Sequence, residues 1–465
     1  MHARRRLAAT AAAAAALLCL ALFAACSSLP TLVPDMARRG APPVQLDSAD
    51  GPLSAARSKA ILGRIEARGL DTDIFALHLA VEEAIAGSPL SIGNRVELLQ
   101  DGPQTYQAMM AAIGAARDHI NMETYILDDD EVGQRFAEAL IARQRAGVQV
   151  NLIRDSVGTL ATPGAFFARL SEAGVNVLEF NPVNPLSSGA GWQVNQRDHR
   201  KLLIVDGRIA FLGGINISSV YSGGSFSQHS KVRPGASPWR DTDLRLEGPV
   251  VAELQKLFIE AWANQQGPPL AARHYFPPLQ ARGNELVRAI GSSPEDPYSL
   301  IYVTLISALR SAQSEIWLAN AYFVPDPQLL AALKEAVARG VDVRLLLPSH
   351  TDSWLVFHAG RAYYTELLKA GVKLYQRRDA LLHVKTAVID GVWSTVGSTN
   401  LDWRSFLHNH EVNAVVLGNG FGERMRAAFL ADLAQSDAIT LERWRRRPLD
   451  DRARELLGRL WEYWL

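Results

Sequence analysis

Two stretches of the sequence carry the same chemically active residue types at the same spacing. The first holds His199, Lys201, Asp206 and Asn216, and the second holds His383, Lys385, Asp390 and Asn400. In both stretches the lysine follows the histidine by two residues, the aspartate by seven and the asparagine by seventeen. The chain has only eight lysines, so the presence of two in this repeated pattern indicates two copies of one site element.

These residue types, taken from both stretches together, suit the transfer of a phosphodiester group. One imidazole can attack phosphorus, while the other protonates the leaving oxygen and later takes a proton from the acceptor. Lysine and asparagine side chains can hold the non-bridging oxygens and offset the charge that develops in the transition state. The lysines supply positive charge, and no cluster of carboxylates accompanies them. We therefore predict a site that uses no metal and no cofactor.

Each motif lies on a predicted hairpin that positions its side chains. The apolar runs Lys201–Val205 and Arg208–Leu212 are separated by Asp206-Gly207, a pair that favours a two-residue hairpin turn. The sequence around Asp390-Gly391 repeats this pattern. Residues i and i+2 of a strand point to the same face, so each histidine shares a face with its lysine. Asp206 and Asp390 belong to the predicted catalytic set with the histidines and lysines, and they are also expected to help fix these turns.

The return strand of each hairpin ends in small residues just before the asparagine. Gly214 precedes Asn216 by two residues, and Ser398 precedes Asn400 by two. Small side chains let the backbone approach a ligand closely. We therefore treat these four residues as candidates for binding phosphate.

Strands and amphipathic helices alternate on the N-terminal side of each motif. In the first half we predict strands at Val96–Leu99, His119–Leu127 and Val148–Ile153, with helices at 104–116 and 131–146. In the second half we predict helices at 299–312 and 327–339, with strands at Ile316–Phe323 and Val341–Leu347. This alternation is typical of an α/β sheet, and its recurrence with small insertions indicates a duplicated domain. Equivalent strand ends would then meet face to face across a pseudo-twofold axis.

The composition is that of a large folded protein. The 465 residues are 48% hydrophobic, and 48 Lys and Arg balance 48 Asp and Glu. Such a chain is neither a long disordered segment nor a polytopic membrane protein. A net charge of zero also argues against binding nucleic acid through a broad basic field.

The first 26 residues are similar to an export signal. Arg4-Arg5-Arg6 is followed by an apolar stretch from Leu7 to Ala25 and then by Cys26. This order resembles a bacterial lipoprotein signal with Cys26 as the lipidated residue, and an uncleaved N-terminal anchor helix is the alternative. Both cysteines, Cys19 and Cys26, lie here, which excludes disulfides, cysteine-ligated metals and thiol catalysis from the mature chain. We predict an exported protein held at a membrane surface on the periplasmic side.

The sequence divides into six predicted segments. They are a signal peptide (1–25), a tether with short helices at 54–68 and 73–87 (26–90), a first domain (91–266), a linker (267–298), a second domain (299–440) and a basic, amphipathic C-terminal helix (441–465). The linker is marked by Gly267-Pro268-Pro269 and Pro277-Pro278, because such runs break regular structure.

The C-terminal segment combines a basic cluster with an apolar stripe. The cluster is Arg443-Trp444-Arg445-Arg446-Arg447. The stripe recurs at helical spacing and consists of Ala453, Leu456, Leu457, Leu460, Trp461 and Trp464. This pattern predicts either an interfacial membrane helix or a helix that docks on the protein's own surface.

The paired motifs are the signature of the phospholipase D superfamily, and their order resembles that of bacterial cardiolipin synthases. The resemblance runs from about Gly93 to Thr440. It includes four further stretches: Glu123-Thr124-Tyr125, Arg245-Leu246-Glu247-Gly248-Pro249, Asn320-Ala321-Tyr322-Phe323-Val324-Pro325 and Asn400-Leu401-Asp402-Trp403-Arg404-Ser405. The resemblance implies an α/β fold of two tandem phospholipase D-like α/β/α sandwich domains, packed around a pseudo-twofold axis with one shared active site.

The resemblance also implies a covalent phosphohistidine intermediate, with His199 as the nucleophile and His383 as the general acid and base. It implies a carboxylate that orients each histidine through the ring nitrogen that does not react. Glu411 takes that position in the second half, and Asp241 takes it in the first, with Asp243 as the alternative.

Four functions remain open at the level of sequence. The favoured one is a phosphatidyltransferase that makes cardiolipin by passing a phosphatidyl group from one phospholipid to the glycerol hydroxyl of phosphatidylglycerol. A phospholipase D would use water as the acceptor of the same intermediate. A nuclease of the same superfamily and a non-catalytic lipid-binding envelope protein are the other two. The expected partners are phospholipids, with phosphatidylglycerol or phosphatidylethanolamine as donor, and a membrane surface, without nucleic acid, and we expect a monomer.

Overall fold

The structure, a computed structural model, describes residues 44–66, 88–184, 193, 195–222 and 238–465. The predicted signal peptide, Cys26, most of the tether and the helix expected over 73–87 lie outside these residues. The first of the two predicted N-terminal helices is α2 (Ala55–Glu66). Within the described ranges, no helix combines the length and the apolar character needed to cross a bilayer.

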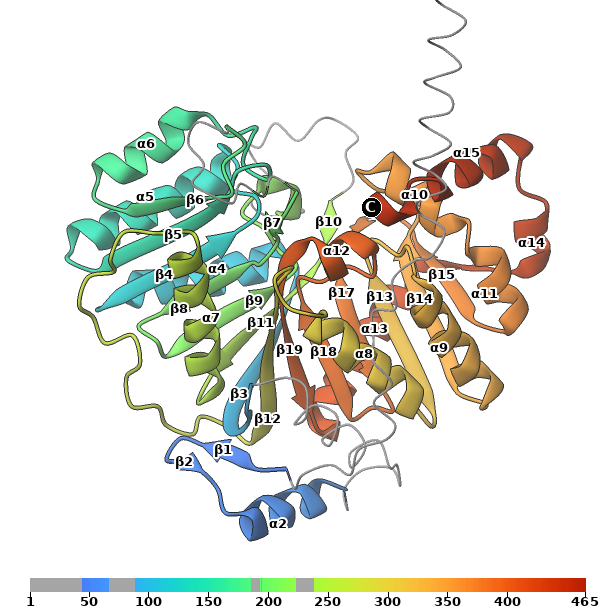
Figure 1. The fold of residues 1–465 in the computed structure, drawn as a ribbon, viewed down its shortest axis with the longest axis horizontal. Coiled ribbons are helices and arrows are strands. Elements are labelled where there is room, and N and C mark those ends of the chain that lie inside the picture. The colour runs from blue at the N-terminus through green and yellow to red at the C-terminus, as the bar shows by residue number, and fades with distance from the viewer. Residues whose placement is uncertain (1–43, 67–87, 185–192, 194, 223–237) are drawn as a thin grey trace, which may run out of the picture.

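Each half of the chain builds a mixed β-sheet, and the two sheets have the same strand order. In the first half, parallel β6 (Asn176–Phe180), β5 (Gln149–Asp155) and β4 (His119–Thr124) continue into antiparallel β8 (Leu202–Val205), β9 (Ile209–Gly213), β11 (Thr242–Glu247) and β3 (Leu90–Gln100). In the second half, parallel β15 (Lys373–Arg377), β14 (Asp342–Pro348) and β13 (Glu315–Asn320) continue into antiparallel β17 (Lys385–Ile389), β18 (Trp393–Gly397), β19 (Asn409–Leu417) and β12 (Glu285–Ser292). The predicted duplication of one α/β domain is confirmed (Figure 1).

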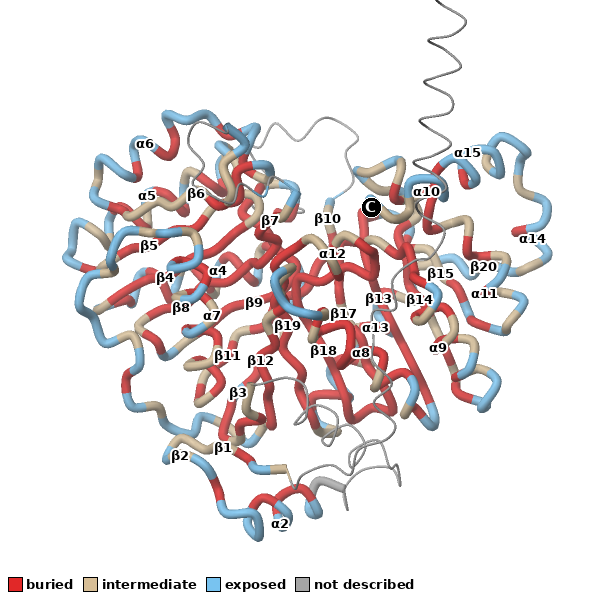
Figure 2. Tube along the Cα trace, in the orientation of Figure 1, coloured by how far each residue is buried: buried red, intermediate tan, exposed pale blue. Residues whose placement is uncertain are grey.

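Helices cover both faces of each sheet, which gives the predicted α/β/α sandwich in each half. On the outer faces lie α4 (Gly102–Ala115), α5 (Glu131–Arg145) and α6 (Gly164–Glu172) in the first half, and α8 (Leu300–Ser311), α9 (Pro327–Ala338) and α11 (Tyr364–Ala370) in the second. The apolar side chains of α7 (Val250–Asn264) and α13 (Asn419–Ala434) instead share one core that contains residues of both halves. This shared core appears in Figure 2 as buried chain that continues through the centre of the molecule.

The strand β12 lies inside the stretch 267–298, which we predicted to be a linker. It pairs with β19 of its own half and, through Leu286 and Val287, with β3 of the first half. Pro294 and Pro297 follow this strand and do not interrupt it. The linker is therefore shorter than predicted, and β3 and β12 tie the two sheets together at the edge remote from the motif histidines.

The C-terminal segment is also divided differently from the prediction. It forms α14 (Leu441–Arg445), α15 (Leu449–Arg459) and the short 3-10 helix η2 (Glu462–Trp464) rather than a single helix. Pro448 separates α14 from α15, because proline lacks the N–H that a continuous helix would need there.

Both motif hairpins have the predicted turn. Asp206 and Gly207 have φ angles of 52° and 59°, and Asp390 and Gly391 have φ angles of 50° and 65°. Two successive residues with positive φ form the turn type that matches the twist of a hairpin. The sequence pattern Asp-Gly therefore identified these turns correctly.

The carboxylates of the two turn aspartates fasten each hairpin to the strand beside it. Asp206 accepts hydrogen bonds from the backbone N–H groups of Arg117, Asp118 and His119, where β4 begins. Asp390 accepts four, from the backbone of Gln313, Ser314 and Glu315 and from the Ser314 hydroxyl, where β13 begins. Both aspartates follow strands that start just after the motif histidines, so they lie at the far ends of β8 and β17. The structure gives them a structural contact, and their catalytic role stays a prediction.

We expect Asp390→Asn to lower the free energy of unfolding by about 1.5–3 kcal/mol. Asparagine tolerates the left-handed turn, but it replaces an ionised carboxylate with a neutral amide that accepts fewer hydrogen bonds. Chemical denaturation measures the loss, with Asp450→Asn at an exposed acid as the control. The folded variant should keep most of any activity that depends on the motif histidines. Unchanged stability together with lost activity would show instead that Asp390 acts in catalysis.

Candidate active site

Backbone pairing between the two halves sets the positions of the motif histidines. Two pairs of short parallel strands join the halves: β7 (Arg197–Asp198) with the start of β19, and β10 (Trp239–Arg240) with β16 (Leu381–Leu382). The N–H of His199 donates to the carbonyl of His410 at 3.0 Å, and the N–H of His383 donates to the carbonyl of Arg240 at 2.8 Å. Each histidine is therefore held against the backbone of the opposite half.

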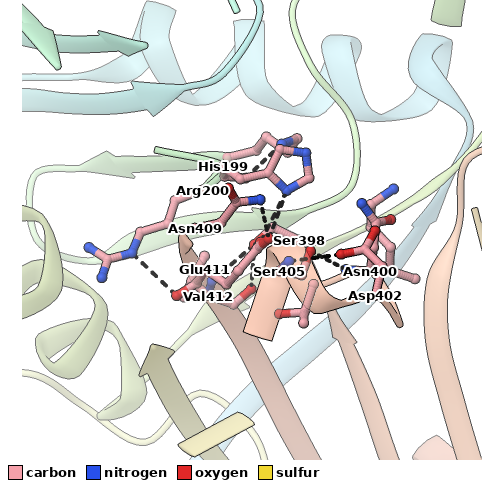
Figure 3. Close-up of polar contacts among 12 residues, drawn as sticks. His199, Arg200, Ser398, Asn400, Asp402, Ser405, Asn409, Glu411 and Val412 are labelled. Carbon is pink, nitrogen blue, oxygen red and sulfur yellow. Dashed lines mark hydrogen bonds and ion pairs between the residues drawn. The ribbon is translucent and has the colours of Figure 1, made fainter. Parts of the chain in front are cut away.

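Each histidine is also held by a carboxylate from the opposite half. Nδ1 of His199 lies 3.0 Å and 3.1 Å from the two oxygens of Glu411, as Figure 3 shows. Nδ1 of His383 lies 2.6 Å from Oδ2 of Asp241. The sequence predicted one orienting carboxylate in each half. The structure adds that the carboxylates are exchanged: each one orients the histidine of the other half. Since Nδ1 of each ring faces a carboxylate, Nε2 is the nitrogen left to react.

The alternative to Asp241 as the orienting group, Asp243, has another contact. Its Oδ1 accepts a hydrogen bond from the backbone N–H of Ile215 at 3.1 Å, just beyond β9. Its carboxylate therefore holds the chain where the first motif ends, and it makes no hydrogen bond to a histidine among the described residues.

The two motif lysines lie beside the histidines in a buried cluster. Nζ of Lys201 donates to the carbonyl of His199 at 2.6 Å, and Nζ of Lys385 lies 3.1 Å and 3.2 Å from the two ring nitrogens of His383. In the part of the chain that the structure describes, no three His, Cys, Asp or Glu side chains gather as metal ligands would. The positions of Lys201 and Lys385 beside the histidines place two amino groups where a phosphodiester held by the histidines would lie.

Burial disfavours the protonated forms of the two lysines and the two histidines. Burial and the nearby Lys385 lower the pKa of Lys201 to about 7, against the opposing effect of Glu411. Burial lowers the pKa of His199 to about 4, although Glu411 opposes this shift too. The pKa values of His383 and Lys385 are also lowered, chiefly by burial. An anion bound here would raise all of these pKa values, so the cluster is suited to an anionic ligand.

Ser398 acts on the carboxylate that holds His199. Its hydroxyl donates to Oε2 of Glu411, and the side-chain amide of Asn409 donates to Oε1 at 3.3 Å (Figure 3). Burial alone would raise the pKa of Glu411, but His199, Lys201 and the hydrogen bond from Ser398 together lower it. The structure thus gives Ser398 an orienting contact, and the phosphate contact that we predicted for it stays a prediction.

Gly214, the counterpart of Ser398, is small for a different reason. A Cβ at this position would lie 2.3 Å from Oδ1 and 2.5 Å from Oδ2 of Asp241. The carboxylate of Asp241 therefore occupies the space that a side chain would fill, and this brings it within reach of His383. The two halves orient their histidines with the same type of group but with different local packing.

The two motif asparagines differ in their remaining hydrogen-bonding capacity. The amide nitrogen of Asn216 donates to the hydroxyl of Tyr221 at 2.9 Å, and its oxygen accepts from the N–H of Ile126 at 3.1 Å. That tyrosine hydroxyl lies 3.3 Å from Nδ1 of His383. The amide oxygen of Asn400 is buried and has no hydrogen-bond partner among the described residues. Asn400 therefore keeps an acceptor that a ligand hydroxyl could use, whereas Asn216 acts through Tyr221, and the phosphate contacts that we predicted for both stay predictions.

Aromatic rings enclose both histidines. The ring of Tyr125 packs edge-on against His199 with centroids 5.1 Å apart, and Nζ of Lys201 lies 5.3 Å from the same ring. The indole of Trp239 lies 5.0 Å from the ring of His383. These contacts fix the orientation of the imidazoles and exclude water, which is the source of the burial effect on their pKa values.

A pair of buried acids lies next to His199, and we assigned it no role from the sequence. No N–H or O–H of the described residues donates to either oxygen of Glu123 or to Oδ2 of Asp198, and the nearest cation, Nη1 of Arg200, is 3.7 Å from Glu123. Burial raises the pKa of Glu123, and burial followed by the charge of Glu123 raises the pKa of Asp198 well above its ordinary value. A proton shared between the two carboxyl groups would satisfy both. Leu382 precedes His383 in the second half, so this pair distinguishes the two histidines.

Comparison with known proteins identifies the family. The family model for "Cardiolipin synthase, PLD-like domain" matches residues 109–222 and 305–433, which contain the first and second motifs. The chain is 36% identical to a cardiolipin synthase of Geobacillus sp. (strain WCH70) over 82% of this chain and 74% of that protein. It is 38% identical to a cardiolipin synthase A of Pseudomonas aeruginosa (strain LESB58) over 76% of this chain and 70% of that protein. The chain belongs to the cardiolipin synthase family.

A solved structure supports the fold of this cardiolipin synthase family member. The crystal structure of phosphatidylserine synthase from Haemophilus influenzae Rd KW20 matches with a TM-score of 0.60, over 83% of this chain and 100% of that one. At 12% sequence identity, this likeness concerns the fold alone. It agrees with the two phospholipase D-like domains implied by the paired motifs.

We expect Lys201→Met to reduce activity by about 10²–10³-fold, because a cation that stabilises the transferring phosphate is lost. The same change should stabilise the protein by about 1 kcal/mol at pH 7, since folding no longer buries an amine there. The pKa of Lys201 falls from 10.5 in the unfolded chain to about 7, so the unfolded state binds more protons between these values. Wild-type stability therefore rises with pH in this range, and the advantage of the variant should shrink at pH 9.

Thermal unfolding and turnover measured in parallel check this expectation. Lys369→Met, at an exposed lysine, is the matched control and should change neither quantity. A Lys201→Met protein that is less stable than the wild type at pH 7 would show that the lysine serves the fold.

Proposed function

We propose that the enzyme transfers a phosphatidyl group from one phospholipid to the glycerol hydroxyl of phosphatidylglycerol, which forms cardiolipin. The observation that carries the proposal is the exchange of carboxylates: two histidines, each with Nδ1 held by the opposite half, share one buried site with two lysines. Membership of the cardiolipin synthase family and the likeness to named cardiolipin synthases support the choice of substrate class.

In the first step, Nε2 of His199 attacks the phosphorus of the donor lipid. The new bond joins nitrogen to phosphorus, the bond from phosphorus to the headgroup oxygen breaks, and Nε2 of His383 gives its proton to that oxygen. The low pKa of His199, about 4, supports it as the nucleophile because its ring stays neutral with a free lone pair. Lys201 and Lys385 would meet the charge on the non-bridging oxygens.

In the second step, the phosphatidyl group passes to the acceptor. The acceptor hydroxyl gives its proton to Nε2 of His383, its oxygen bonds to phosphorus, and the bond from phosphorus to His199 breaks. Water at the same position would give phosphatidic acid, so the site must favour the lipid alcohol over water. The aromatic walls formed by Tyr125 and Trp239 support this preference because they keep the site dry.

The test is to incubate the purified full chain with vesicles of labelled phosphatidylglycerol and to separate the products. We expect cardiolipin and glycerol in equal amounts from the wild type, and none from His199→Ala. His274→Ala, at a histidine whose side chain is 89% exposed, is the matched control and should behave as the wild type. Rapid quenching of the wild type during turnover should trap lipid phosphate on His199 in an acid-labile, base-stable form, which peptide mapping can locate.

The products distinguish the alternatives. Phosphatidic acid without cardiolipin would identify a phospholipase D. If neither phosphatidic acid nor cardiolipin forms, the assignment to lipid substrates is contradicted. Label trapped on His383 rather than on His199 would reverse the roles of the two histidines.

We also propose that the protein is exported and held at the membrane through a lipid on Cys26. The support is the order of basic, apolar and cysteine residues in the first 26 positions. Cells grown with labelled palmitate should yield labelled protein, and Cys26→Ser should abolish the label while Cys19→Ser leaves the position of the label unchanged. Labelling that survives in Cys26→Ser would contradict the lipid anchor.

A further inference from the structure

Exposed apolar side chains gather at the edge of the molecule where the motif histidines lie. Of the thirteen large hydrophobic side chains that the described residues leave exposed, ten lie there, and the other three are Phe276, Leu430 and Leu449. Five of the ten follow strands of the two sheets: Val157 and Leu160 after β5, Val183 after β6, Val220 after β9 and Trp354 after β14. The strands that precede them all end at the edge where the motif histidines lie.

The other five belong to the predicted C-terminal stripe. They are Leu456, Leu457, Leu460, Trp461 and Trp464, which are 48–66% exposed. The helix does pack on the protein, but through its other side, where Glu455 and Gly458 are buried. A Cβ on Gly458 would lie 2.6 Å from the backbone nitrogen of Ala359 in α10 (Trp354–Arg361), so the two helices touch closely. The stripe therefore faces away from the protein.

The C-terminal residues fix this stripe beside the active site. The carbonyl of Leu465 accepts a hydrogen bond from the N–H of Arg404 at 2.7 Å, and the rings of Tyr463 and Trp403 lie 5.9 Å apart. Arg404 and Trp403 belong to α12 (Trp403–Leu407), which starts three residues after Asn400 of the second motif. Figure 1 shows α15, α10, α12, β7 and β10 along one edge, opposite to β1 (Leu46–Ser48) and β2 (Gly51–Pro52).

Positive charge accompanies the stripe. The segment 441–465 contains seven arginines against five acids. Four arginines, Arg361, Arg443, Arg446 and Arg447, line a hollow of about 430 Å³ between α10, α14 and α15. Two of these, Arg361 and Arg447, are paired with Glu455, whereas Arg443 has no acidic partner among the described residues. Asp437 and Asp451 also line the hollow, but each is paired with an arginine, so Arg443 is, of the four arginines, the cation left to meet an anionic group next to the apolar surface.

We propose that this edge is a docking face for an anionic lipid bilayer. The docking face consists of the five strand-end side chains and the five stripe side chains named above, with the arginine-lined hollow at its border. Leucine and tryptophan beside arginine is the combination that inserts at the level of lipid headgroups, and exposed apolar side chains gathered at one edge mark a surface for contact with a membrane or a partner. The proposal rests on the proposed function, because it lets a phospholipid reach His199 and His383 from the bilayer.

The test places a fluorescent probe at single sites of the full chain. Cys19→Ser and Cys26→Ser remove the natural thiols, and Leu460→Cys, Leu160→Cys or Phe276→Cys adds one thiol for an environment-sensitive label. Phe276 is the matched control because it is also exposed but lies near Gly207, at the opposite edge. The vesicles contain phosphatidylglycerol, phosphatidylcholine and a lipid with a quencher on its acyl chain.

We expect the probes at positions 460 and 160 to shift to the blue and to be quenched several-fold on adding vesicles, and the probe at 276 to stay unchanged. Absence of quenching at 460 and 160, or equal quenching at 276, would overturn the proposal. A blue shift that grows with protein concentration without vesicles would identify a second copy as the occupant and would overturn it too. None of these readouts requires turnover, so they remain decisive if the proposed function fails.

A second variant measures the effect on catalysis. Leu456→Ser/Leu460→Ser/Trp464→Ser should lose most of its activity on phosphatidylglycerol in vesicles but keep that on a short-chain phosphatidylglycerol dissolved as monomers. Phe276→Ser is the control and should keep both activities. Full activity of the triple variant on vesicles would contradict the docking face.

Discussion

The exchange of carboxylates between the two halves is the interaction on which the rest of the structure depends. Glu411 reaches His199 and Asp241 reaches His383 only because β19 pairs with β7 and β10 pairs with β16. Those short backbone pairs in turn need the shared core under α7 and α13 to hold the sheets together. In neither half alone does a histidine have its orienting carboxylate. We therefore expect a single domain of this chain to be inactive.

This arrangement carries an electrostatic cost that the ligand relieves. Burial lowers the pKa of both Lys201 and Lys385, and the charge of Lys385 lowers that of Lys201 further, so both charged forms are disfavoured without a bound anion. A phosphodiester brings negative charge to the same place, so binding and protonation support each other. The turn aspartates fasten the two hairpins to β4 and β13, so the strands that carry both lysines are held in place.

Much of the fold and the motif could be predicted from local sequence. The Asp-Gly turns, the hairpins around them and the alternation of strands and helices depend on neighbouring residues, and the structure confirms them. The exchange of carboxylates could not be predicted, because Glu411 and His199 are 212 residues apart and no local pattern records which histidine a carboxylate meets. The role of β12 was missed because the prolines on either side of it mark a linker, although none lies within the strand. The buried pair of Glu123 and Asp198 could not be predicted from the sequence either, since only tertiary packing brings the two residues together.

Nuclear magnetic resonance of the histidine rings tests the exchange most directly. With ¹⁵N-labelled histidine, the resonances of His199 and His383 can be assigned by their loss in the two alanine variants. The exchange predicts that Glu411→Gln shifts the ring nitrogens of His199 and leaves those of His383 in place, and that Asp241→Asn does the reverse. A shift of His383 in Glu411→Gln, with His199 unchanged, would show that each half orients its own histidine and would contradict the account.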